Sequence, residues 1–226
     1  MIAGLSGAAW RRIVPFAVFM VLLALRGALA DGGPAGVDPR WVYGGAVLLV
    51  GGLLIWWRRD YGELAAQTLP SGREAMFAAA VGLVVFLLWT RLDAAWMRLG
   101  ETTASFVPVD AAGRLEWPLV AARALGATLV VPVMEELFWR SFFMRWIHGL
   151  PFEAVPPQRV GVKAIALSTF VFVLAHTLWL AAVVAGLAYA WLYIRSGKLW
   201  AAVTAHAVTN GALTVWVVLS GNWQFW

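Results

Sequence analysis

The chain has 226 residues, of which 62% are hydrophobic and 13% are charged, and its mean hydropathy is +0.78. This composition excludes an ordinary soluble domain and indicates an integral membrane protein. The formal net charge of +5 does not indicate a nucleic-acid partner, because lysine and arginine stand singly or in pairs beside apolar runs. Such residues set membrane topology and contact anionic lipid, so the lipid bilayer is the expected partner.

Seven apolar runs predict an all-α, polytopic transmembrane helix bundle, since a helix needs about 20 residues to span the bilayer. Six or eight spans are the alternatives, because residues 161–195 must supply two helices without a strong turn signal, so one of them is expected to be short or re-entrant. The first run ends in Ala28-Leu29-Ala30 and imitates a signal peptide, but Arg26 interrupts it and we expect an uncleaved helix. The runs occupy residues 13–30, 41–57, 75–92, 117–147, 161–179, 180–195 and 199–220.

These spans are expected to pack as one membrane domain. Residues 1–116 supply about three spans, residues 117–220 supply about four and carry the polar motifs, and residues 221–226 form a short tail. Basic residues gather in alternate loops, which predicts a cytoplasmic N-terminus. The segment 93–116 departs from this rule, because it contains arginines although it is assigned to the outside.

Glu135, Glu136 and Arg140 lie inside the fourth apolar run. Glu136 and Arg140 are four residues apart, so they face each other on a helix, and we expect Arg140 to neutralise and orient Glu136. Adjacent helical residues point about 100° apart, which leaves Glu135 free to face elsewhere. Pro132 is expected to kink this helix and widen a cavity beside the carboxylates. The alternative is a solvated ion pair at a helix end.

Three further polar residues occur in later apolar runs, namely His176, His206 and Asn210. His206 and Asn210 are also four residues apart and share one helix face. Taken one at a time, each histidine is open to a purely structural interpretation, in which it is hydrogen-bonded to a nearby carbonyl. At about 1.5 Å per helical residue, however, Glu135 and both histidines fall in one layer of the membrane, roughly 10–22 Å deep. The sequence therefore predicts a shared polar cavity.

Three motifs, in this order and spacing, resemble those of the CPBP family, which includes CAAX prenyl endopeptidases of the Ras-converting type and bacterial Abi proteins. They are Glu-Glu-x-x-x-Arg at 135–140, Phe-x-x-x-His at 172–176 and His-x-x-x-Asn at 206–210. The resemblance covers roughly residues 117–218. The short chain and its tryptophan content resemble the CAAX protease-related proteins found beside exosortase systems.

This resemblance implies an intramembrane endopeptidase that cleaves a membrane-anchored peptide or protein. Glu135 and His176 would activate a water molecule, while His206 and Asn210 would stabilise the oxyanion. We favour catalysis without a cofactor, but Glu135, His176 and His206 would be the ligands if zinc were present. A multi-pass protein of the bacterial cytoplasmic (inner) membrane is expected. The sequence does not predict the oligomeric state.

Two other classes of function compete with a protease. One is a non-proteolytic membrane protein, such as an immunity factor, that uses the same fold to bind or protect a partner. The other is a proton-coupled transporter in which Glu135, His176 and His206 form a relay. The intact motifs argue against the first, and the lack of a detectable internal repeat argues against the second. Cleavage of a membrane-embedded peptide separates the protease from both.

Overall fold

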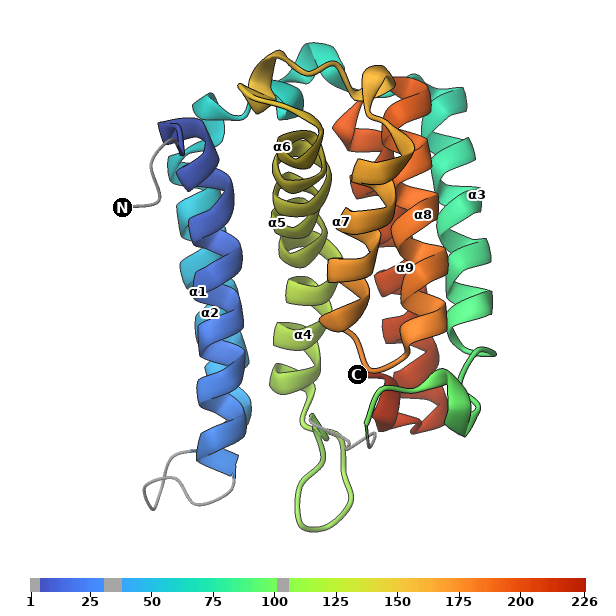
Figure 1. Cartoon of the computed structure of the whole chain (residues 1–226). Coiled ribbons are helices and arrows are strands. Elements are labelled where there is room, and N and C mark those ends of the chain that lie inside the picture. The colour runs from blue at the N-terminus through green and yellow to red at the C-terminus, as the bar shows by residue number, and fades with distance from the viewer. Residues whose placement is uncertain (1–4, 31–37, 101–105) are drawn as a thin grey trace.

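The described residues form a bundle of seven helical segments (Figure 1). A computed structural model describes residues 5–30, 38–100 and 106–226, so most of the expected connection at 31–40 and part of the segment at 93–116 lie outside the described residues. Within those described ranges no β-strand occurs, which confirms the all-α fold class. The seven segments are α1 (Gly7–Ala30), α2 (Arg40–Trp56), α3 (Gly72–Trp89), the composite helix α4–α6 (Trp117–His148), α7 (Val162–Leu174), α8 (Trp179–Ser196) and α9 (Leu199–Ser220).

Length separates two of these segments from the other five. Five are long and apolar enough to cross a membrane, whereas α2 has 17 residues and α7 has 13. At about 1.5 Å per residue, α7 is about 20 Å long and falls short of the roughly 30 Å hydrocarbon core. Its span was expected to reach residue 179, but the helix ends at Leu174. The short helix expected between residues 161 and 195 is therefore α7.

Two π-helical turns interrupt the α-helical winding of the composite helix. Its parts are α4 (Trp117–Leu125), the π-helical turn η5 (Gly126–Val130), α5 (Val131–Glu136), the π-helical turn η6 (Leu137–Phe143) and α6 (Met144–His148). Pro132 has no backbone N–H and cannot continue the regular hydrogen-bond ladder, and the widened turn η5 lies directly before it. Turns of this kind are rare and are frequent at functional sites. Glu135 and Glu136 thus lie on a short α-helical piece between two π-helical turns.

Glycine allows the closest helix contacts in the bundle. A Cβ atom on Gly82 of α3 would overlap the backbone carbonyl of Ala205 in α9, so the two helices touch through their main chains. A Cβ atom on Gly186 of α8 would come within 2.9 Å of the Thr169 side chain in α7. Small residues are how membrane helices approach one another when apolar burial gives no advantage over lipid. These contacts hold α9 against α3 and α8 against α7.

A buried polar network joins α1 to the composite helix near the end of the bundle that carries the N-terminus (Figure 1). Arg12 of α1 donates from Nη2 to both carboxylate oxygens of Glu63, at 2.8 and 2.7 Å, and from Nε to Ser141 Oγ at 3.1 Å. Ser141 in turn donates to Glu63. Burial acts to raise the pKa of Glu63, but the charge of Arg12 and these hydrogen bonds outweigh it and hold the pKa below its ordinary 4.5. This network fixes α1 against η6.

Candidate active site

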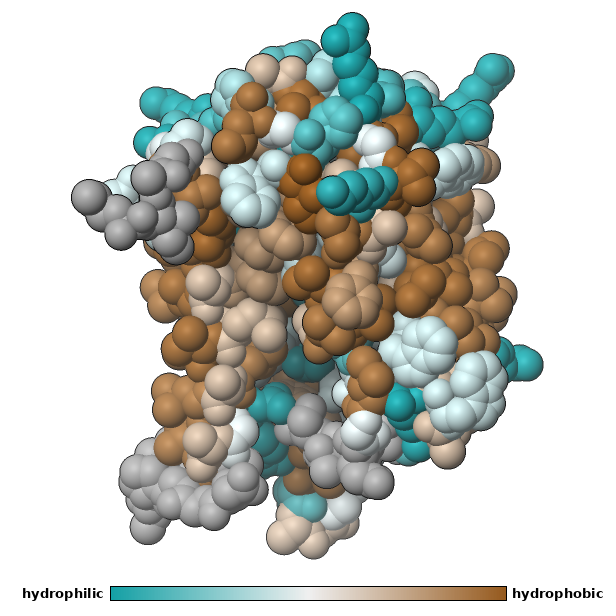
Figure 2. Space-filling view, in the orientation of Figure 1, coloured by the Kyte–Doolittle hydropathy of each residue, from teal (hydrophilic) through white to brown (hydrophobic). Residues whose placement is uncertain are grey.

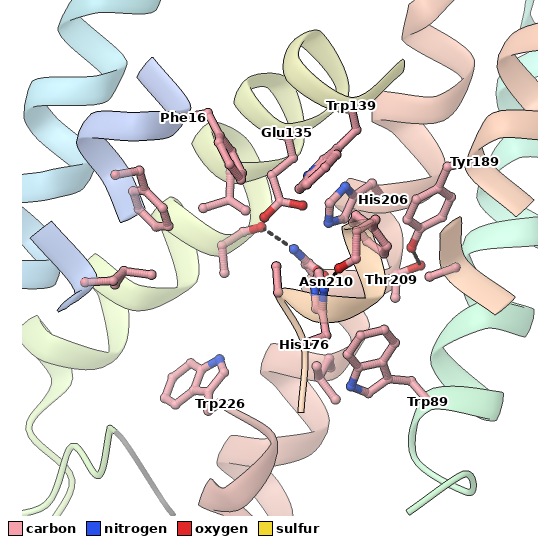
Figure 3. A pocket seen from close by; sticks show the side chains of 18 of the residues that line it. Phe16, Trp89, Glu135, Trp139, His176, Tyr189, His206, Thr209, Asn210 and Trp226 are labelled. Atoms are coloured by element: carbon pink, nitrogen blue, oxygen red, sulfur yellow. Dashed lines mark hydrogen bonds between the residues drawn. The ribbon is translucent and has the colours of Figure 1, made fainter. Parts of the chain in front are cut away.

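A cavity of about 290 Å³ lies between α1 and the helices of the C-terminal half. In the space-filling view a cleft with hydrophilic residues at its base interrupts the apolar surface (Figure 2). The cavity brings together Glu135, His176, His206 and Asn210. Glu135 reaches it from the composite helix, and His206 and Asn210 reach it from α9 (Figure 3). The volume equals that of about ten water molecules at ~30 Å³ each, so it admits water and a short stretch of peptide.

Glu136 is fully buried and is not among the residues that line this cavity. Its carboxylate contacts Arg140 and His206. Its Oε1 accepts from Arg140 Nη1 at 3.0 Å, as the spacing of four residues predicts. The same oxygen lies 2.9 Å from His206 Nδ1. Arg140 also donates to the carbonyl of Gly186 at 3.3 Å. Glu136 therefore links the composite helix to α8 and α9 and is already engaged, which leaves it unsuited to meet a substrate.

Glu135 lines the cavity and makes no ion pair within the described part of the chain. Its Oε2 is buried and has no hydrogen-bond partner. A buried carboxylate oxygen without a donor is unusual, because such an oxygen costs about 1–3 kcal/mol or more when unsatisfied. The Oε2 atom of Glu136 is also without a partner among the described residues, but Glu136 does not line the cavity and its Oε1 is paired with Arg140 and His206. Glu135 is thus the one of the two carboxylates that lines the cavity and, over the described residues, is not ion-paired, as the 100° offset from Glu136 implies.

His176 follows the end of α7, where the chain leaves the helix and turns toward α8. Its Nδ1 lies 2.8 Å from the carbonyl oxygen of Phe172, which only accepts, so Nδ1 carries the proton and Nε2 carries the lone pair. The edge of Trp89 contacts the imidazole with ring centroids 5.7 Å apart. Irregular backbone at membrane depth is tolerated where it lines a cavity, and both Ala175 and His176 line this one. The early end of α7 therefore serves to present His176.

The α9 residues are held by partners on the composite helix and on α8. Asn210 donates from Nδ2 to the carbonyl of Ala127 at 2.9 Å, which leaves its second N–H available (Figure 3). The His206 ring stacks on Tyr189 with centroids 4.9 Å apart and planes inclined by 19°. Tyr189 donates to Thr209 Oγ1 at 2.8 Å. These contacts fix the two rings and the amide in position.

Tyr189 is the site residue that the motifs did not identify. It is 1% exposed and lies in the middle of α8, and its ring also stands 5.4 Å from the Arg140 guanidinium. A tyrosine in mid-span is a signal in itself, because its hydroxyl needs a hydrogen-bond partner far from the membrane interface. That partner, Thr209, comes from another helix and could not be read from local spacing.

A catalytic zinc ion takes three protein ligands and one water molecule. Over residues 5–30, 38–100 and 106–226, no three His, Cys, Asp or Glu side chains lie close enough together to hold a metal ion. The Nδ1 atoms of His176 and His206 lie against the oxygens of Phe172 and Glu136, and Nε2 of each ring stays available. No catalytic step below depends on zinc.

Residues 117–212 match the family described as type II CAAX prenyl endopeptidase, Rce1-like. No curated protein and no solved structure matches the chain in the same comparisons. The matched segment contains the four cavity residues together with Glu136 and Arg140, while α1 to α3 lie outside it. The exosortase-associated subgroup stays a prediction. The C-terminal part of this multi-pass membrane protein, residues 117–212, is thus similar to the Rce1-like type II CAAX prenyl endopeptidases.

Proposed function

We propose that the protein is a glutamate-dependent intramembrane endopeptidase that hydrolyses a peptide bond in a membrane-anchored substrate. One observation carries the proposal: Glu135, which has a carboxylate oxygen without a hydrogen-bond partner, lines one cavity of about 290 Å³ with His176, His206 and Asn210. The apolar walls supplied by α1, including Phe16, suit an apolar substrate segment.

In the proposed reaction Glu135 acts as the general base. It removes one proton from a water molecule while the water oxygen attacks the carbonyl carbon of the scissile bond. The second hydrogen of that water is donated to Nε2 of His176, whose lone pair is available because Nδ1 binds the Phe172 carbonyl. Both groups thus orient the attacking oxygen.

Attack places negative charge on the former carbonyl oxygen, and two N–H groups would stabilise it. One is the second N–H of Asn210, and the other is Nε2–H of His206. Because Nδ1 of His206 lies 2.9 Å from the Glu136 carboxylate oxygen, donation from Nε2 requires that both ring nitrogens carry a hydrogen in this step. Glu135 finally returns the proton to the leaving nitrogen, the C–N bond breaks, and the products are a carboxylic acid and an amine.

Glu136 and Arg140 support this site without touching the substrate. Arg140 holds Glu136 in place, and Glu136 in turn orients the His206 ring. We further propose that the protein lies in the bacterial cytoplasmic membrane with its N-terminus in the cytoplasm, because basic residues gather at that end of the spans.

The test is to search for cleavage of membrane proteins directly. Membranes are incubated with the purified wild type, with Glu135→Gln and with Glu153→Gln, an exposed and chemically matched control. New chain ends are then identified by mass spectrometry. We expect products that appear with the wild type and the control and are missing with Glu135→Gln. If the wild type yields none, a binding or transport function replaces the protease.

A further inference from the structure

Arg123 lines the same cavity as Glu135, but it lies on α4, the first part of the composite helix. Twelve residues separate the two positions on one composite helix, which corresponds to about 18 Å along its axis at ~1.5 Å per residue. Arg123 lies only six residues after the start of α4 at Trp117. It belongs to none of the three motifs, and the reaction described above does not use it.

The partners of Arg123 are aromatic. Its guanidinium carbon stands 4.3 Å from the ring centroid of Tyr43 and 5.5 Å from that of Phe106. The Tyr43 hydroxyl is its hydrogen-bond partner, while Nε is buried and has none. Arg123 forms no ion pair with a carboxylate within the part of the chain that the structure describes. The neighbouring charged group is Arg26, which has the same sign and cannot neutralise it.

The other buried arginines of the bundle are satisfied differently. Arg12 is paired with Glu63, and Arg140 is paired with Glu136. Arg145 donates to the backbone carbonyls of Val155 and Glu153. Arg123 thus differs from them in lining a cavity while it forms no ion pair within the described residues. Ionisable groups inside a membrane protein are expensive and mark a ligand or ion pathway by default.

We propose that Arg123 binds a carboxylate of the substrate peptide and so selects which peptide bond reaches Glu135. This inference rests on the proposed protease function. Arginine and carboxylate form paired, charge-assisted hydrogen bonds, and the Arg123 guanidinium has no carboxylate partner within the described residues. An extended peptide covers about 3.3–3.6 Å per residue, so the carboxylate lies roughly four to six residues from the cleaved bond.

The carboxylate is either a chain terminus or an acidic side chain, and the experiment distinguishes these sources. The probes are fluorescent 20-residue apolar peptides that carry a single Glu at successive positions, each with a Gln counterpart, and one peptide made with a C-terminal acid or amide. Binding is measured with full-length protein in detergent micelles. All proteins also carry Glu135→Gln, so that binding is observed without turnover and a failure of the protease proposal does not obscure the result.

We expect Glu or acid peptides to bind on the order of 10-fold more tightly than their neutral counterparts at the favoured positions. Arg123→Gln should abolish this preference, Arg123→Lys should retain part of it, and Arg159→Gln, at an exposed loop position, should leave it unchanged. If Arg123→Gln does not fold, Arg123→Lys decides: a reduced preference supports the inference, and a preference as strong as that of the unsubstituted protein contradicts it.

Two results would overturn the inference. In the first, charged and neutral peptides bind equally to the Arg123 protein, or the preference survives in Arg123→Gln. In the second, phosphatidylglycerol purifies with the Arg123 protein but not with Arg123→Gln, and its removal does not restore a carboxylate preference. The cation would then hold a lipid phosphate and have no role in substrate selection.

Discussion

The Nδ1 atom of His206 lies 2.9 Å from Oε1 of Glu136, a residue 70 positions earlier in the chain. This contact gives the two adjacent glutamates, Glu135 and Glu136, different partners. Glu136 is occupied by His206 and Arg140, while Glu135 keeps an oxygen free in the cavity. The neighbouring carboxylates therefore have different surroundings and, in the proposed reaction, different roles.

Glu136→Gln is expected to reduce stability. The substitution leaves Arg140 charged and without its partner in a site that is 3% exposed, and breaking a buried ion pair typically costs about 3–5 kcal/mol. Thermal unfolding in detergent, followed by tryptophan fluorescence, should show a clearly lower Tm or a loss of expression. The exposed control Glu153→Gln should unfold at the wild-type temperature. A Glu136→Gln protein as stable as the wild type would contradict the supporting role.

Asn210→Ala is expected to give a folded but slow enzyme. It removes one oxyanion donor and also the hydrogen bond to the Ala127 carbonyl, and loss of one such donor typically lowers kcat by about 10²–10³. Steady-state cleavage of a substrate peptide should show this fall mainly in kcat. A change confined to KM would mean that Asn210 binds substrate and does not stabilise the transition state.

Glu63 is expected to make stability depend on pH below neutrality. Because its folded pKa lies below the ordinary 4.5, its carboxylate contributes stability above that pH, and the contribution is lost as pH falls through the folded pKa. The Tm difference between the wild type and Glu63→Gln should be largest near pH 7 and shrink below about pH 4. A difference that stays constant from pH 3 to 7 would show that Glu63 acts through packing and not through its charge.

Metal removal is expected to leave activity unchanged. The three candidate ligands are not grouped as a zinc site over the described residues. Protein purified without nickel affinity and dialysed against a chelator should keep its cleavage rate, and elemental analysis should give far less than one metal ion per chain. Near-stoichiometric zinc that is lost together with activity would instead support a metalloprotease.

Local patterns in the sequence predicted much of this architecture. Seven apolar runs predicted seven helices because hydropathy alone decides which segments can lie in lipid. The pairing of Glu136 with Arg140 followed from a spacing of four residues on one helix. The short helix before His176 was expected because 35 residues had to supply two spans.

Contacts between distant segments could not be predicted in the same way. The bond from His206 to Glu136 and the stack of His206 on Tyr189 depend on how α5, α8 and α9 pack. Pro132 signalled a disturbance in the fourth run, but the two π-helical turns on either side of Glu135 depend on the surrounding bundle. The position of Arg123 in the same cavity likewise required the three-dimensional arrangement.

Single-turnover cleavage of one identified substrate by Glu135→Gln, compared with the wild type, tests the central claim most directly. Glutamine keeps the shape of the side chain but cannot accept the proton from water, and general-base catalysis contributes about 10²–10⁴ in rate. We predict a protein with the wild-type Tm and a cleavage rate lower by at least that range. A Glu135→Gln protein that still cleaves, alongside a Glu136→Gln protein that folds normally and is inactive, would show that the two carboxylates have the opposite roles.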